Sequence, residues 1–173
     1  MRYRRRRAAC AALLAATASL QGCPDGNGVS VTASSSTATV GQLVAFTVSM
    51  NFSDATLGGG FRIGYDPTRL RFLSFSWDNG LADDPFFRVV CPNPEEFRCN
   101  GIDTSNNVLL VYGNFNAPLQ HSYIVGSIIF QTLQTGSASV SPVGDPDYTG
   151  PFVSSDTFDP LAVSYSGSTI RVN

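Results

Sequence analysis

Four cysteines and one histidine are the residues of this chain best suited to covalent or acid–base chemistry. Cys91 and Cys99 enclose a short proline-containing segment, Cys91-Pro-Asn-Pro-Glu-Glu-Phe-Arg-Cys99. In an oxidising compartment such a pair forms a disulfide by default. A zinc site is the alternative, but His121 is the only histidine and too few ligands remain to complete one. We therefore predict a Cys91–Cys99 disulfide that stiffens a surface loop and contributes about 2–3 kcal/mol in the chain-entropy model.

The other two cysteines belong to the N-terminal segment. Five arginines occupy the first seven positions, and an apolar stretch from Ala8 to Leu20 follows them. A basic start, a short apolar core and small residues after it are typical of a secretory signal, and the stretch is too short to span a bilayer. Cys10 lies inside the apolar core and is expected to be removed with it.

The ending Leu20-Gln21-Gly22-Cys23 resembles the bacterial lipobox, in which the cysteine is acylated and becomes the mature N-terminus. The resemblance implies that residues 1–22 are a lipoprotein signal peptide and that Cys23 is a lipidation site. Residues 23–28 would then be a short tether. The mature protein would be exported and lipid-anchored to a bacterial cell membrane, at the outer membrane or the cell surface. The alternative is a plain signal peptide with an incidental Cys23.

Catalytic arrangements are not apparent. His121 is the only histidine, and no Gly-x-Ser-x-Gly nucleophile elbow accompanies it. Glu95 and Glu96 are neighbours on a short loop, where their side chains point apart rather than forming a glycosidase-type pair. We therefore expect a protein that is not an enzyme.

A second group of polar residues invites a metal hypothesis. Carboxylates gather in a Pro/Gly/Ser-rich segment, and calcium takes loop carboxylates and carbonyls as ligands. The candidate residues are Asp145, Asp147, Asp156 and Asp159. The alternative is that they are ordinary solvated loop acids, and no other cofactor is expected.

Aromatic residues outside regular strands are candidates for ligand binding, because their rings stack on sugars or fill pockets of a partner. Trp77 is the only tryptophan, and its same-face neighbours Leu73 and Phe75 indicate that it is partly core. The loop candidates are Phe86, Phe87, Tyr148, Phe152 and Phe158. The alternative is that these loops fold back over the sheet edges.

Charge restricts the partners. The chain contains no lysine, and five of its eleven arginines precede Cys23, whereas all thirteen acidic residues follow it. The mature part is therefore acidic, which argues against nucleic acid and against electrostatic adhesion to anionic lipid. Acyl chains are then the only expected attachment to a membrane.

Alternation of apolar and polar residues predicts strands throughout residues 29–173. The clearest are 44–52, 61–65, 70–77, 108–115, 123–133, 137–141, 161–166 and 168–172. The alternation slips by one residue between Phe72 and Leu73, which predicts a β-bulge or a strand that changes sheets. Asp66 to Arg69 is expected to form one helical turn capped by Asp66. Short strands without helices indicate an all-β protein, a two-sheet antiparallel β-sandwich of the jelly-roll type.

Several of these segments together resemble the cohesin domain and its relatives, the family-2 and family-3 carbohydrate-binding modules. The matching pieces are the strand at residues 40–49, the Gly-rich turn at 58–60, the element Tyr65-Asp66-Pro67-Thr68-Arg69-Leu70 and the late strand at 125–132. The resemblance covers about residues 29–142 and implies a nine-stranded jelly roll without catalytic residues. Cohesins bind dockerin modules, through polar side chains on the strand before the Tyr-Asp-Pro element. Gly58, Gly59 and Gly60 occupy those positions here, so the resemblance supports the fold better than a ligand.

The sequence thus predicts a non-catalytic, cohesin-like binding module of an envelope lipoprotein. Its leading expected ligand is carbohydrate, or a partner within polysaccharide-handling machinery. A protein–protein scaffold without glycan affinity, which joins envelope or secreted proteins, is the alternative, and a structural lipoprotein is another. An exposed row of aromatic rings would favour carbohydrate, whereas an aromatic-poor sheet face with an apolar patch would favour a protein partner.

Overall fold

A computed structural model describes residues 26–81, 87–145 and 150–173. Strands dominate it, with two single-turn 3₁₀ helices, η1 (Asn79–Leu81) and η2 (Phe97–Cys99). The strands are β1 (Asn27–Ala33), β2 (Thr37–Ala38), β3 (Leu43–Tyr65), β4 (Leu70–Trp77), β5 (Phe87–Cys91), β6 (Asn107–Gly113), β7 (Leu119–Thr132), β8 (Gly136–Gly144), β9 (Val153–Ser154), β10 (Val163–Ser166) and β11 (Ser168–Val172).

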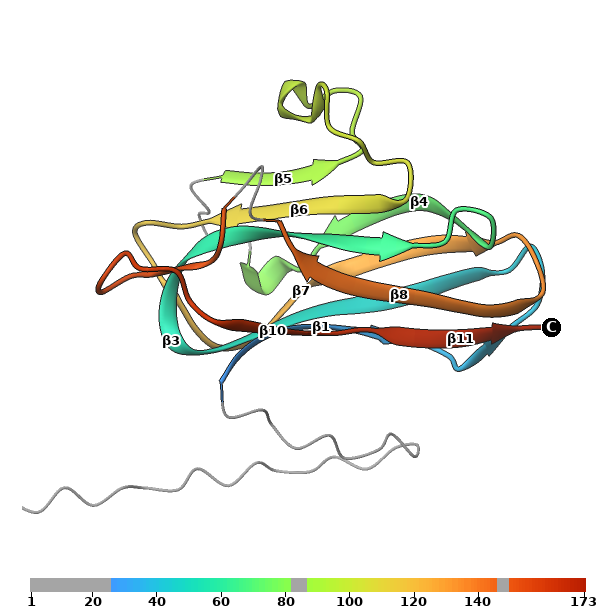
Figure 1. The fold of residues 1–173 in the computed structure, drawn as a ribbon, viewed down its shortest axis with the longest axis horizontal. Helices are drawn as coiled ribbons and strands as arrows, with labels where there is room; N and C mark the ends of the chain where they lie inside the picture. The colour runs from blue at the N-terminus through green and yellow to red at the C-terminus, as the bar shows by residue number, and fades with distance from the viewer. Residues whose placement is uncertain (1–25, 82–86, 146–149) are drawn as a thin grey trace, which may run out of the picture.

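The long strand β3 belongs to both layers of a sandwich (Figure 1). Its first half pairs with β1 and β7, and β10 and β4 extend that sheet on either side. Its second half pairs with β6 and β8, and β5 and β11 extend the other sheet. The predicted two-sheet β-sandwich is confirmed, with the exception that β1–β10 and β11–β2 pair in parallel.

The core fills the space between the two sheets. Strand positions that alternate in β1, β3 and β7 point inward, as the sequence periodicity predicts. Aromatic rings interlock at its centre, where Phe130 lies edge-on to Phe46 at 5.7 Å and against Tyr65 at 4.8 Å. Such ring pairs add to the stability that burial of their surface provides.

Two local predictions around β4 are confirmed. The register of the β4–β7 pairing shifts between Phe72 and Ser74, so the slip in alternation marks a β-bulge at Leu73. The bulge turns Leu73 outward and leaves Phe75 and Trp77 against the core, so Leu73 does not share a face with Trp77 as predicted. Asp66 caps the preceding turn, because its carboxylate accepts hydrogen bonds from the Thr68 amide and hydroxyl.

The expected turn at Gly58–Gly60 is wrong, because these glycines lie within β3 and pair with Gly113, Tyr112 and Val111 of β6. Glycine is required for close approach rather than for turning. A Cβ on Gly58 would lie 2.1 Å from the carbonyl oxygen of Tyr112, and one on Gly59 would lie 2.7 Å from the backbone of Phe152. The strand therefore continues where composition alone suggests a break.

Strand β1 already begins at Asn27, so the predicted tether overlaps the folded domain at residues 27 and 28. The predicted signal peptide and Cys23 lie outside the described residues. Within the described residues no helix is long and apolar enough to cross a membrane.

Candidate binding surface

A second, smaller core lies on the outer side of the β5–β6 sheet. Outward side chains of these two strands pack beneath the segment that joins them, residues 92–106, together with Cys99 and Ile102 of that segment. The buried members are Val89, Cys91, Leu109 and Val111. The segment therefore covers part of a sheet face that would otherwise be open, and it forms a raised platform over β5 and β6 (Figure 1).

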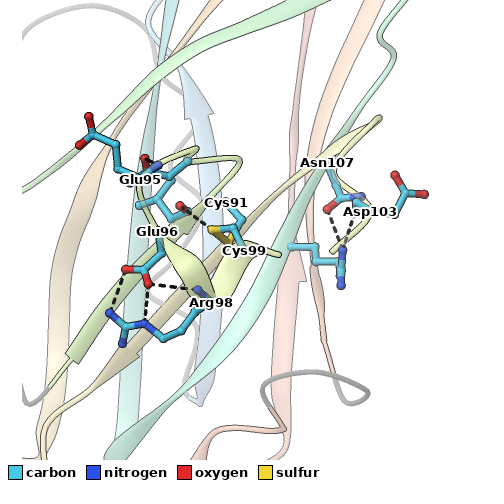
Figure 2. Close-up of a disulfide and its surroundings, with 10 residues drawn as sticks. Cys91, Glu95, Glu96, Arg98, Cys99, Asp103 and Asn107 are labelled. Atoms are coloured by element: carbon cyan, nitrogen blue, oxygen red, sulfur yellow. Dashed lines mark hydrogen bonds and ion pairs between the residues drawn. A yellow bond between two sulfur atoms is a disulfide. The ribbon is translucent and has the colours of Figure 1, made fainter. Parts of the chain in front are cut away.

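The predicted disulfide closes this platform. Cys91 and Cys99 are bonded, and Cys91 is fully buried in the small core. Next to the disulfide, Glu96 faces Arg98, which donates from Nε at 2.7 Å and from a terminal nitrogen at 2.8 Å (Figure 2). The hydrogen bonds from Arg98 lower the pKa of the Glu96 carboxyl below its ordinary value. One disulfide and one ion pair thus fix a loop of only a few residues.

Phe97 projects from the tip of this fixed loop. It lies between the paired Glu96 and Arg98, is 76% exposed, and has the Arg98 guanidinium 5.6 Å from its ring centroid. A large apolar side chain held in solvent on a rigid support is the kind of residue that anchors protein–protein contacts.

Arg62 fastens the platform to the neighbouring strands. It points outward from β3 between Leu109 of β6 and Val143 of β8. Its Nε donates to Asp145 Oδ1 at 3.0 Å, and a terminal nitrogen donates to the Asp103 carbonyl and to Asn107 Oδ1. One guanidinium therefore ties the end of β8, the start of β6 and residue 103 of the platform into one surface.

Beyond Arg62 the same face is open and carries small hydroxyl side chains. Ser137, Ser139 and Ser141 point outward from β8, followed by the exposed Val143. Ser139 is hydrogen-bonded to Thr169 of β11 at 2.8 Å. We call the platform at residues 92–106, Arg62 and these outward residues of β8 and β11 the candidate binding surface.

The predicted aromatic ligand residues do not come together. Trp77 packs against the main core, with the Phe75 ring 5.1 Å away and Arg88 over its face. The prediction that Phe152 binds a ligand is wrong, because its side chain is 1% exposed and packs against Phe52 and Phe61. Phe87 begins strand β5 rather than lying in a loop. Phe158 is exposed, while Phe86 and Tyr148 lie outside the described residues.

The predicted calcium ligands are also separated. Asp145 is buried and bound to Arg62, so its carboxylate serves an ion pair. Asp156 and Asp159 are exposed near the end of β9, and Asp147 lies outside the described residues. Among the residues described here, no group of three or more His, Cys, Asp and Glu side chains could hold a metal ion.

Sequence reasoning missed Arg62, Phe97 and the small second core. One signal for that core was present, since Val108 to Tyr112 is an unbroken apolar run. A strand with one solvent face alternates, whereas an unbroken run indicates cover on both faces. The alternation of Arg62 with Phe61 and Ile63 places it outward, but its three partners come from distant segments that no local pattern identifies.

Comparison with known proteins places this geometry in a structural class. No family model matches the chain, and no curated protein matches it. Solved structures do match, and those that follow are cohesin modules. The third cohesin of ScaC from Acetivibrio cellulolyticus, solved with the ScaB dockerin, has a TM-score of 0.64 at 15% identity, over 84% of this chain and 98% of that one.

Two further structures agree. CaCohA2 of Clostridium acetobutylicum has a TM-score of 0.62 at 14% identity, over 86% of this chain and 92% of that one. A non-cellulosomal cohesin from the archaeon Archaeoglobus fulgidus has a TM-score of 0.59 at 12% identity, over 84% and 91%. The chain is therefore a cohesin-like β-sandwich, and the resemblance found in the sequence is confirmed at the level of the fold.

Proposed function

We propose that this domain is a non-catalytic binding module whose partner is a protein, and that it works at the cell envelope as an exported, lipid-anchored domain. One observation favours a protein over a polysaccharide. Every aromatic side chain that the structure describes within a strand is buried or packed against the main core. The described outer faces therefore lack the row of exposed rings on which sugars stack.

The candidate binding surface supports the protein hypothesis in a second way. Its exposed apolar side chains are Val143, which pairs with Arg62 across β3 and β8, and Phe97, which lies between the ion-paired Glu96 and Arg98. A rigid aromatic anchor with a polar periphery is the usual anatomy of a specific protein interface. Several cohesins of similar fold were solved in complexes with dockerins, which is consistent with protein recognition by this fold.

The proposal can be tested by site-specific crosslinking. A photoreactive amino acid is placed at Phe97 or Ser139 on the candidate binding surface, and at exposed Thr47 on the outer face of the other sheet as a control. Each variant is irradiated with the secreted and envelope proteins of the source organism. The same preparations are tested for retention on a panel of soluble and insoluble polysaccharides.

We expect one protein to be crosslinked from both Phe97 and Ser139 and not from Thr47, with no retention on any polysaccharide. Crosslinks of equal yield from all three positions would show that the candidate binding surface is not specific. Selective retention on one glycan would contradict the protein hypothesis and support carbohydrate recognition.

A further inference from the structure

The end of the sandwich where β1 begins is tied together by the side chain of Asn27. Its amide oxygen accepts hydrogen bonds from the backbone amides of Ser53 and Asp54, at the bend of β3. Its amide nitrogen donates to Asp54 Oδ2 at 3.1 Å and to the carbonyl of Ala162. The point where the chain enters the domain is therefore fixed against the β3 bend and against the segment that leads into β10.

Two exposed phenylalanines lie at this same end. Phe158 is 70% exposed and is only four residues before Ala162, so the two are within about 14 Å of each other. Phe115 is also exposed, on the loop that follows β6, where the Asn114 amide donates to the carbonyl of Leu57 in the β3 bend. Large apolar side chains are thus held in solvent around the entry point of the chain.

The backbone holds Phe158 outward at a conformational cost. Its φ of 62° lies in the left-handed region, which bulky residues rarely adopt. The turn around it is closed by hydrogen bonds from the Phe158 amide to the Ser154 carbonyl and from the Ser154 amide to the Asp159 carbonyl. An exposed aromatic ring in a strained, fully bonded turn points to a role outside the folded domain.

The few residues between Cys23 and the start of β1 limit how far this end of the sandwich can lie from a lipid anchor. Only four residue steps separate Cys23 from Asn27, which span at most about 14 Å in any conformation. Acyl chains on Cys23 would therefore keep the β3 bend, the Phe158 turn and the loop of Phe115 near the lipid surface.

We propose that this end of the sandwich rests on the bilayer that holds the chain's own anchor, with the ring of Phe158 inserted at the lipid–water interface and Phe115 beside it. The inference rests on the proposed lipidation of Cys23. Partial insertion of apolar rings adds to the affinity of a lipid anchor and also fixes orientation. This orientation directs the platform of the candidate binding surface away from the lipid. The platform lies at the start of β6, whereas Phe115 follows the opposite end of that strand.

The exposed carboxylates at this end indicate which lipid headgroups it can face. The exposed acids at this end are Asp54, Asp156 and Asp159, and in the described part of the chain the ion pairs of arginine involve other carboxylates. Anionic headgroups would repel these carboxylates. The expected surface is therefore zwitterionic phospholipid, and vesicles of phosphatidylcholine are the probe of choice.

Spin labelling of the mature lipoprotein, from which Cys10 is removed with the signal peptide, tests the orientation. With Cys91 and Cys99 in a disulfide and Cys23 acylated, Phe158→Cys offers the only free thiol for a nitroxide. Val40→Cys is the matched control. Val40 is an exposed apolar residue that precedes the start of β3, away from the bend at Ser53 and Asp54. Phe115→Cys is a second variant for the lipid-facing end. Collision of each nitroxide with lipid-dissolved oxygen and with a water-soluble nickel chelate is measured in phosphatidylcholine vesicles and in detergent.

At position 158 we expect oxygen accessibility to rise and nickel accessibility to fall on transfer to vesicles, with the same direction at 115 and no change at 40. Equal behaviour at 158 and 40 would overturn the orientation while leaving the anchor in place. The unsubstituted protein is the control for the anchor. If it takes up nitroxide at Cys23, the cysteine is not acylated, and both the anchor and this orientation are overturned.

Discussion

Arg62 joins three chain segments through one guanidinium group, and its removal should weaken all of them together. Arg62→Ala leaves the buried Asp145 carboxylate without its cation, so we expect a loss of about 2–4 kcal/mol in the free energy of unfolding. Urea denaturation measures the loss. Asp145→Asn is the partner variant, and the double variant should lose less than the sum of the two single losses. Additive losses would show that the pair is not coupled.

Two glycines of β3 should differ in how much stability they lose on substitution by alanine. A methyl group on Gly58 would meet the Tyr112 carbonyl oxygen at 2.1 Å, and its φ of 125° already disfavours a side chain. We expect Gly58→Ala to cost about 3 kcal/mol or more, or to prevent folding. Gly64→Ala is the control in the same strand, since its nearest neighbour would be 3.7 Å away. Similar thermal midpoints for the two variants would contradict this account of the Gly58–Gly60 segment.

At the scale of elements, the platform at residues 92–106 should depend on its disulfide more than the sandwich does. Its own buried core has four fully or nearly buried residues, whereas the main core spans most of the strands. Reduction, or Cys99→Ser, should lower global stability by about 2–3 kcal/mol. Amide hydrogen exchange should then accelerate first in residues 92–106. Loss of protection in β3 and β7 at the same rate would show instead that platform and sandwich unfold as one unit.

The elements also show which features of the fold are local in origin. The bulge at Leu73, the cap at Asp66 and the disulfide were predictable, because each depends on residues close together in the sequence. The continuity of β3 through Gly58–Gly60 was not, because it depends on the approach of Tyr112 and Phe152 from distant segments. The candidate site divides in the same way, since the loop closure was predictable and the partners of Arg62 were not.

The whole molecule carries an acid-sensitive set of carboxylates. Hydrogen bonds from Thr68, Arg98 and Ser105 lower the pKa values of Asp66, Glu96 and Asp103, respectively. In the unfolded chain these groups regain ordinary pKa values of about 4, so the unfolded state binds more protons in acid than the folded state does. Stability should be complete above about pH 5 and fall as pH decreases through these values. Urea midpoints between pH 7 and 3 test this, and Asp66→Asn with Glu96→Gln should flatten the decline.

The same linkage has the opposite sign at high pH, because two tyrosines lie partly within the core. Burial raises the pKa values of Tyr65 and Tyr165 above their ordinary value of 10.0. The folded state therefore resists ionisation, and its stability is complete below about pH 10 and declines as pH rises through the folded pKa values. Tyr165→Phe cannot ionise, so it should retain its urea midpoint further into alkali than the unsubstituted protein. Identical declines would show that Tyr165 ionises as readily in the fold as in the unfolded chain. Because Tyr65 lies against Phe130 at the centre of the core, Tyr65→Phe should shift the alkaline limit in the same direction. If a variant that combines Tyr65→Phe and Tyr165→Phe loses stability at the same alkaline pH as the unsubstituted protein, the groups responsible lie outside the sandwich core.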